Sequence, residues 1–220
     1  MTASRARPGP VTWAQILARG GGDVTAYVGK RPLAWHADPR AVRPDVLALD
    51  VAARSGWACL ADGGCQCPPI CGACDGAAHC LDHCRRRGII RQCGHLVRTQ
   101  DVSDEWVAEQ DAVIASADTG GMLVLVESSS VGWAGRRPVP ALSVERYVGA
   151  ALALCARRGI PALRVVASQW QTAILGRHRR EAGKALALAA AKRVMGAIEV
   201  ASEDVADAVC LALWGRGGRP

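Results

Sequence analysis

The sequence predicts one α/β domain built on a five-stranded mixed sheet flanked by helices. Three observations support this prediction. In the second half of the chain, apolar runs of strand length alternate with stretches of helical spacing, which is typical of parallel strands joined by helices. Ahead of them, two short apolar runs are separated only by a tight turn, as in an antiparallel hairpin. The chain has 220 residues, 50% hydrophobic and 21% charged, so it can bury one ordinary core.

The first three strands are expected around the hairpin. Residues 46–50 (VLALD) form an apolar run that ends in an acid, which indicates a strand buried on both faces. Residues 55–60 (SGWACL) follow the turn ARSG and are expected to pair with it. A third strand is expected at residues 95–99 (HLVRT), after a Cys/His-rich insertion in this first hairpin.

The remaining elements alternate between helix and strand. They are expected at residues 102–117 (helix), 122–127 (strand), 143–159 (helix), 162–166 (strand), 181–195 (helix) and 203–214 (helix). Four segments therefore make up the chain: a loosely ordered N-terminal extension, a core in two pieces, an insertion and a tail. The extension spans residues 1–44, the core spans residues 45–60 and 94–215, the insertion spans residues 61–93, and the tail spans residues 216–220. The extension is rich in Gly and Pro, and either packs against the domain or reaches DNA as an arm.

The charge of the chain favours a polyanionic partner. There are 27 basic and 20 acidic side chains, which gives a net charge of +7. A GC-rich coding sequence also explains many arginines, so their abundance alone carries little weight. The sequence shows no secretory signal and no apolar run of membrane-spanning length, so we expect a cytoplasmic protein. A protein that is encoded by a phage and acts in the cytoplasm of its host would also fit.

Acidic residues follow two of the predicted buried strands and recur on the last helix. Asp50 and Glu127 each end an apolar run, where a carboxylate is costly unless a cation neutralises it. Asp204 and Asp207 lie three residues apart and so project from one helix face. Capping and helix-dipole roles are alternatives for each acid except Asp207, which lies deeper in the helix. Converging carboxylates would take two hard cations, Mg²⁺ or Mn²⁺, suited to phosphodiester hydrolysis.

The motifs that carry these acids resemble those of the RuvC-like Holliday junction resolvases of the RNase H-like superfamily. The segment LALDVAARSGWA is similar to the phage-type first motif, with Gly six residues after the Asp. VLVESSS and EDVADAVCLAL are similar to the second motif and to the final helix. The resemblance covers about residues 45–60 and 94–215, and it implies an RNase H-like fold.

The resemblance also implies roles for individual residues. Asp50, Glu127, Asp204 and Asp207 would be the catalytic residues and the ligands of two Mg²⁺ or Mn²⁺ ions, with Glu203 an alternative to Asp204. Lys184 would contact the scissile phosphate or the neighbouring strand, or else it is a solvated helix residue. Trp170 and Gln171 would have a structural role.

The cysteine insertion departs from that family. Seven cysteines and three histidines lie between residues 65 and 95, more than the four ligands that one Zn²⁺ takes. In a reducing compartment such a cluster indicates metal rather than disulfides, so we expect one or two structural zinc ions. The candidate ligands are Cys65, Cys67, Cys71, Cys74, Cys80, His83, Cys84 and Cys93. Cys59, Cys155 and Cys210 lie in apolar stretches and are expected in the core.

Beside the zinc ligands, Arg85, Arg86 and Arg87 make the insertion electropositive, which favours contact with DNA phosphates over contact with a protein. Together these features predict a metal-dependent endonuclease that resolves four-way DNA junctions as a homodimer. One alternative is a nuclease of the same fold that acts on other branched DNA or on RNA. The other is a zinc-bearing nucleic-acid-binding protein with an inactive nuclease core, although all four acids are present.

Overall fold

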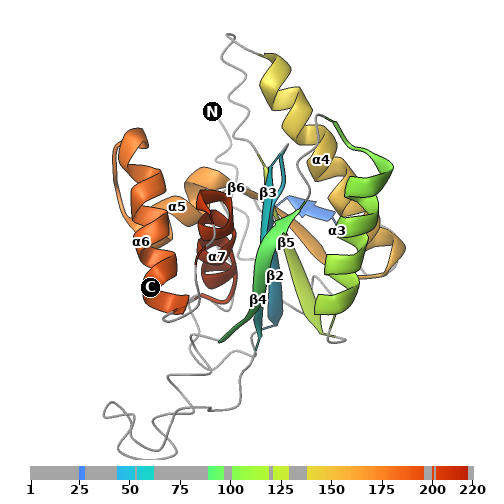
Figure 1. Cartoon of the computed structure of the whole chain (residues 1–220), viewed down its shortest axis with the longest axis horizontal. Helices are drawn as coiled ribbons and strands as arrows, with labels where there is room; N and C mark the ends of the chain where they lie inside the picture. The colour runs from blue at the N-terminus through green and yellow to red at the C-terminus, as the bar shows by residue number, and fades with distance from the viewer. Residues whose placement is uncertain are drawn as a thin grey trace, which may run out of the picture.

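The computed structural model describes residues 25–27, 44–52, 54–61, 89–96, 101–118, 121–128, 138–195, 200 and 202–217. In this part of the chain a sheet lies between two layers of helices (Figure 1). One face of the sheet is covered by α3 (Asp104–Ala117) and α4 (Pro138–Arg157). The other face carries α5 (Ala167–Leu175), η2 (Arg180–Ala182), α6 (Gly183–Met195) and α7 (Glu203–Gly215). None of the helices described is long and apolar enough to cross a membrane.

The sheet is mixed, and its strand order is β1-β6-β5-β2-β3-β4. Strands β2, β3 and β4 form an antiparallel meander, while β5, β6 and β1 extend it in parallel from β2. The strands are β1 (Thr25–Tyr27), β2 (Asp45–Asp50), β3 (Ser55–Ala61), β4 (Ile89–Leu96), β5 (Met122–Ser128) and β6 (Ala162–Val166). The predicted mixed α/β sheet is thereby confirmed, and four of the five predicted strands lie at the expected residues.

A sixth strand lies within the residues predicted to form the N-terminal extension. Residues Thr25–Tyr27 of that extension pair in parallel with Ala162 and the two residues that follow it in β6. The sequence TAY is too short to show a strand period, and the pairing depends on backbone groups of a distant strand edge. The strand was therefore not visible in the sequence.

The third predicted strand was misplaced. It was expected at residues 95–99, but β4 covers Ile89–Leu96 and pairs with the whole length of β3. The sequence IIRQCGHL has no clear apolar run because β4 lies at the edge of the sheet. The insertion boundary of 61–93 changes with it, since Ala61 and the residues from Ile89 onward belong to the sheet. Residues 62–88 therefore connect β3 to β4, not the strands of the first hairpin.

The predicted C-terminal tail also needs correction, because its first residue belongs to the core. Arg216 is fully buried, and its guanidinium donates to the Pro44 carbonyl oxygen at 3.3 Å and to Asp45 Oδ1 at 3.3 Å. A buried arginine is tolerated only when it is paired, and the carboxylate at the start of β2 provides that partner. The end of α7 is thereby tied to the first strand of the central hairpin.

Strand alternation divides the core into two clusters. In β2, Val46 and Ala48 pack towards α7, whereas Leu47 and Leu49 pack towards α3 and α4, and all four are fully buried. Helix α7 is buried throughout its length after the first turn, because it lies directly on β2 and β3 and is covered by α5 and α6. Polar side chains on α7 that face the sheet are thus held in a largely apolar layer. The predicted core positions of Cys59, Cys155 and Cys210 are confirmed.

Candidate active site

Two of the predicted acids lie side by side at the carboxyl ends of adjacent parallel strands. Asp50 ends β2, and Glu127 is the penultimate residue of β5. In the β2–β5 ladder Leu49 pairs with Val126, so the two acids follow at the same level. By alternation, both share the face that packs against α7. The apolar run that precedes each acid thus sets both its position and its side of the sheet.

The other two acids come from the first turns of α7. Ser202 is the N-cap of this helix, and its hydroxyl accepts a hydrogen bond from the Val205 amide at 3.2 Å. Asp204 is partly buried, and Asp207 is buried between the helix and the sheet. Glu203, the alternative to Asp204, is exposed. The predicted assignment of Asp204 and Asp207 to one helix face is therefore consistent with the structure.

Gly56 explains how α7 reaches the acids of the sheet. It pairs with Asp50 across the β2–β3 ladder and faces α7. A Cβ placed on Gly56 would lie 2.2 Å from the Asp204 carbonyl oxygen and 2.7 Å from the Val205 amide nitrogen, which is far inside van der Waals contact. The first turn of α7 thus touches the backbone of β3, one strand away from Asp50. The glycine of the first motif is needed for this close approach.

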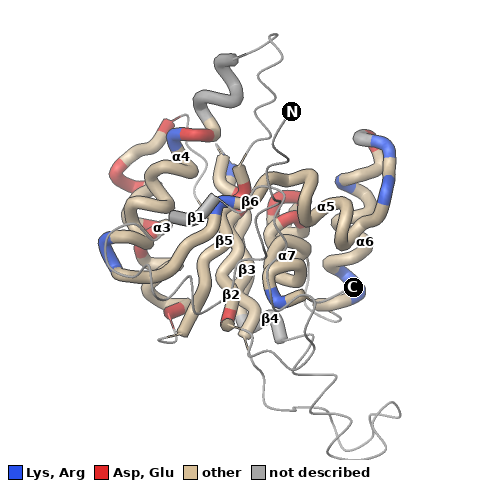
Figure 2. Tube along the Cα trace, turned by 180° about the vertical axis from the view of Figure 1, so that it is seen from behind, with Lys and Arg blue, Asp and Glu red and all other residues tan. Residues whose placement is uncertain are grey.

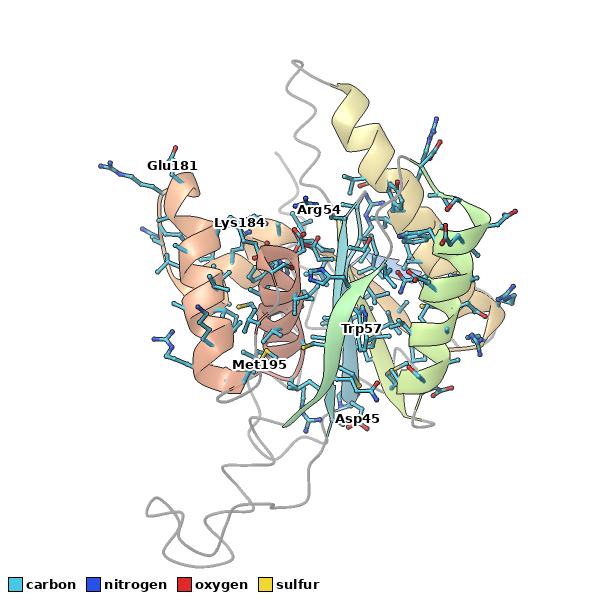
Figure 3. All side chains as sticks on the ribbon, in the orientation of Figure 1. Asp45, Arg54, Trp57, Glu181, Lys184 and Met195 are labelled. Atoms are coloured by element: carbon cyan, nitrogen blue, oxygen red, sulfur yellow. The ribbon has the colours of Figure 1, made fainter. Side chains whose placement is uncertain are left out.

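Lys184 links the helices over the acids. Its Nζ donates to Asp207 Oδ2 at 2.9 Å and lies 3.8 Å from Asp204 Oδ1. Figure 3 shows Lys184 on α6 at the same end of the molecule as Arg54, which follows β2 in the turn to β3. Burial lowers the pKa of Lys184, but the hydrogen bond to Asp207 and the neighbouring carboxylates outweigh it and raise that pKa. The lysine is thus charged and bound to the acidic cluster.

Burial, and then the neighbouring charges, raise the pKa values of three of the acids. Burial raises the pKa of Asp50 from 3.8 to about 7, with further contributions from the charges of Asp207 and Asp204. Burial, followed by the charges of Asp50 and Asp207, also raises the pKa of Glu127 well above its ordinary value. Burial likewise raises the pKa of Asp207, against the opposing effect of Lys184. The acids therefore lie close enough to influence one another's ionisation, and Lys184 opposes only part of the rise in their pKa values.

The donor set suits a hard divalent cation. Carboxylate oxygens are the ligands that Mg²⁺ and Mn²⁺ prefer, and a bound cation would offset both the burial and the mutual repulsion that raise these pKa values. As the side chains stand, no three Asp, Glu, His or Cys side chains of the described residues form a ready metal-binding group. Asp50, Glu127, Asp204 and Asp207 are nonetheless the residues whose chemistry fits such an ion.

One contact of this site was not predicted from the sequence. The indole nitrogen of Trp170, in α5, donates to Glu127 Oε2 at 2.6 Å. The motif resemblance indicated only a structural role for Trp170. Nothing in the spacing of residues 127 and 170 shows that they meet, because the pairing of β5 with β6 and the turn into α5 bring them together.

Most of the predicted zinc site lies outside the described residues. This applies to Cys65, Cys67, Cys71, Cys74, Cys80, His83 and Cys84, and to the predicted DNA contacts Arg85, Arg86 and Arg87. Cys93 is described: it lies in β4 opposite Ala58, half-buried, and burial raises the pKa of its thiol. The zinc site remains a prediction.

Comparison with known proteins identifies the fold. No family model and no curated protein matches the sequence. RuvC of Thermus thermophilus in complex with a Holliday junction substrate is 18% identical, with a TM-score of 0.53, over 78% of this chain and 92% of that one. A second T. thermophilus RuvC structure is 18% identical, with a TM-score of 0.52, over 77% and 92% of the two chains. The yeast mitochondrial Holliday junction resolvase Ydc2 is 15% identical, with a TM-score of 0.41, over 81% of each chain. The chain has the RNase H-like fold of RuvC.

Proposed function

We propose that this chain is a metal-dependent endonuclease that resolves four-way DNA junctions. The observation that supports the proposal is that Asp50 and Glu127, at one end of a RuvC-like sheet, lie close to Asp204 and Asp207 of α7, so that burial and then the neighbouring carboxylates raise the pKa values of Asp50, Glu127 and Asp207. The fold likeness to RuvC bound to a junction supports the same substrate. Structural ion pairs alone would not require four acids beside a single lysine.

The four acids would hold two Mg²⁺ or Mn²⁺ ions. Such a pair supplies an activated water and stabilises the leaving oxygen of a phosphodiester. The residues of this chain contribute the site itself: the sheet fixes Asp50 and Glu127, and the buried α7 fixes Asp204 and Asp207. Lys184 neutralises part of the acidic charge and is half-exposed, so its ammonium can also meet a phosphate of the DNA.

Basic side chains beside the site would hold the DNA backbone. Arg54 is exposed in the turn that follows β2, and Arg177 and Arg179 are exposed in the turn between α5 and α6 (Figure 2). Figure 2 shows basic positions (blue) along the segment that joins α5 to α6. If arginines contact the phosphates, the logarithm of the DNA-binding constant should fall linearly with the logarithm of the salt concentration, with a slope of about −0.9 for each contacted phosphate.

A homodimer is part of the proposal, because symmetric nicking of two opposed strands requires two active sites related by a two-fold axis. The alternative within the same fold is a nuclease for other branched DNA or for RNA. The inactive nucleic-acid-binding alternative is disfavoured because all four acids are present in the chain.

The substrate class can be tested directly. The full-length chain should cut a mobile four-way junction in Mg²⁺, by paired nicks, while flap, linear duplex and RNA/DNA hybrid substrates of the same sequence should be cut much more slowly. In Ca²⁺ the chain should bind the junction without cutting it, since the loose coordination of Ca²⁺ positions water poorly. Faster cleavage of the flap or the hybrid would favour the alternative nuclease, and no cleavage in Mg²⁺ or Mn²⁺ would favour the inactive protein.

The cysteine insertion yields a separate prediction. The purified chain should contain about two Zn²⁺ ions by elemental analysis, on the basis of four ligands per ion. Cys71→Ser should lower the zinc content and the junction affinity, because metal binding folds such modules and Arg85, Arg86 and Arg87 would lose their placement. The matched control is Cys155→Ala, which removes a thiol from the core and should leave the zinc content unchanged. A zinc-free wild-type chain with full junction affinity would contradict the prediction.

A further inference from the structure

Trp170 contacts the predicted metal site without being able to ligate a metal. Its side chain is fully buried in the cluster between the sheet and α5–α7. The indole N–H, which is its only polar group, donates to Glu127 Oε2 at 2.6 Å. Because the acceptor belongs to a carboxylate, the bond is strong when Glu127 is ionised.

The position of this contact follows from the sheet. Glu127 pairs with Val165 of β6, and α5 starts two residues after Val165. Trp170 therefore lies on the first turns of a helix that leaves the sheet beside Glu127. The close packing of its ring leaves the indole nitrogen little freedom to move, so the orientation of the acceptor oxygen is set by the core.

We propose that Trp170 is a positioning residue for Glu127: its indole N–H holds Oε2 and leaves Oε1 as the oxygen that meets a divalent cation. The inference rests on the proposed function, since it takes Glu127 as a metal ligand. Partners of this kind fix the orientation of a ligating carboxylate, and their removal typically weakens metal binding. A purely packing role for Trp170 would require the ring but not the N–H.

Trp170→Phe separates the two roles, because it keeps a buried aromatic ring and removes the donor. The matched control is Trp106→Phe. Trp106 is also fully buried, and its indole donates to Ser55 Oγ at 3.3 Å, but it lies in the cluster on the opposite face of the sheet. We expect Mn²⁺ binding to the zinc-loaded full-length chain, measured by electron paramagnetic resonance, to weaken by roughly 10- to 100-fold in Trp170→Phe. In Trp106→Phe it should stay within about twofold of the wild type.

A measurement on the wild-type chain keeps the proposal testable if Trp170→Phe folds poorly. Among the seven tryptophan indole N–H resonances, that of Trp170 should lie far downfield, because its bond to a carboxylate is short. It should move when Mg²⁺ is added. Glu127→Gln identifies it, because among the described residues the indole that donates to Glu127 is that of Trp170.

The outcomes distinguish this inference from the proposed function. Three results would overturn the positioning role even if the wild type cuts junctions. They are unchanged Mn²⁺ binding in Trp170→Phe, an equal loss of Mn²⁺ affinity in Trp170→Phe and Trp106→Phe, and a Trp170 indole resonance that does not move when Mg²⁺ is added. Conversely, the wild type could cut no nucleic acid while Mn²⁺ binding weakens in Trp170→Phe and not in Trp106→Phe. This result would overturn the proposed function and support the positioning role. A wild type that binds no Mn²⁺ would overturn both.

Discussion

Asp50→Asn is expected to reduce junction cleavage by orders of magnitude and, at the same time, to stabilise the metal-free protein. The loss of cleavage is expected because the substitution removes the negative charge of a proposed metal ligand. The gain in stability follows from the pKa of Asp50, which burial and then Asp207 and Asp204 raise to about 7. An acid with a raised folded pKa is most stabilising when protonated, so the wild type should lose stability as pH rises from about 4 to about 7. The stability of Asp50→Asn should decrease much less over the same pH range.

At pH 8 without metal we expect Asp50→Asn to raise the free energy of unfolding by roughly 1–3 kcal/mol, a rise in Tm of several degrees. Mg²⁺ should stabilise the wild type more than the variant. The control is Asp101→Asn, the same chemical change at an exposed carboxylate that pairs with Arg146 on the surface. It should change stability by less than about 0.5 kcal/mol and leave cleavage unchanged. If Asp50→Asn cleaved junctions at nearly the wild-type rate, the assignment of Asp50 to the active site would be wrong.

Gly56→Ala should cause the second large effect. The new Cβ would lie 2.2 Å from the Asp204 carbonyl oxygen and 2.3 Å from its carbonyl carbon, and backbone atoms cannot rotate away. The first turn of α7 must therefore move off β3, at a cost of about 2–4 kcal/mol of stability. Since this turn carries Asp204 and leads into Asp207, cleavage should fall by about 100-fold, as expected when reacting groups are misplaced by an ångström.

Thermal unfolding and junction cleavage of Gly56→Ala would be compared with those of Gly149→Ala. Gly149 is exposed on α4, and a Cβ there would meet nothing within 4 Å. Alanine is the better helix former, so Gly149→Ala should stabilise the chain by about 0.5–1 kcal/mol and leave cleavage unchanged. If Gly56→Ala retained wild-type stability and activity, the close approach of α7 to β3 would not be what assembles the acids.

The strands that carry the site were readable from the sequence. VLALD and MLVLVE are apolar throughout because both faces of β2 and β5 are covered by helices, and the acid that ends each run is then conspicuous. The spacing of Asp204 and Asp207 in a short helix likewise follows from local geometry. The approximate convergence of all four acids could therefore be predicted.

Edge elements could not be predicted in this way. Strand β4 has one neighbour and a mixed sequence, and β1 has three residues, so neither has an apolar period that distinguishes it from a loop. Each is defined by backbone hydrogen bonds to a strand far along the chain. The same limit applies to Arg216, which was assigned to a tail and proves to be a buried partner of Asp45.

Patterns within a few residues predicted the α/β class, the strand ends that carry Asp50 and Glu127, and the helix face of Asp204 and Asp207. Tertiary structure alone decided that Gly56 admits α7 to the sheet, that Lys184 binds Asp207, and that Trp170 holds Glu127. Each of these contacts joins residues at least 23 positions apart in the chain, and the packing of the sheet against α5, α6 and α7 brings them within hydrogen-bonding distance or closer.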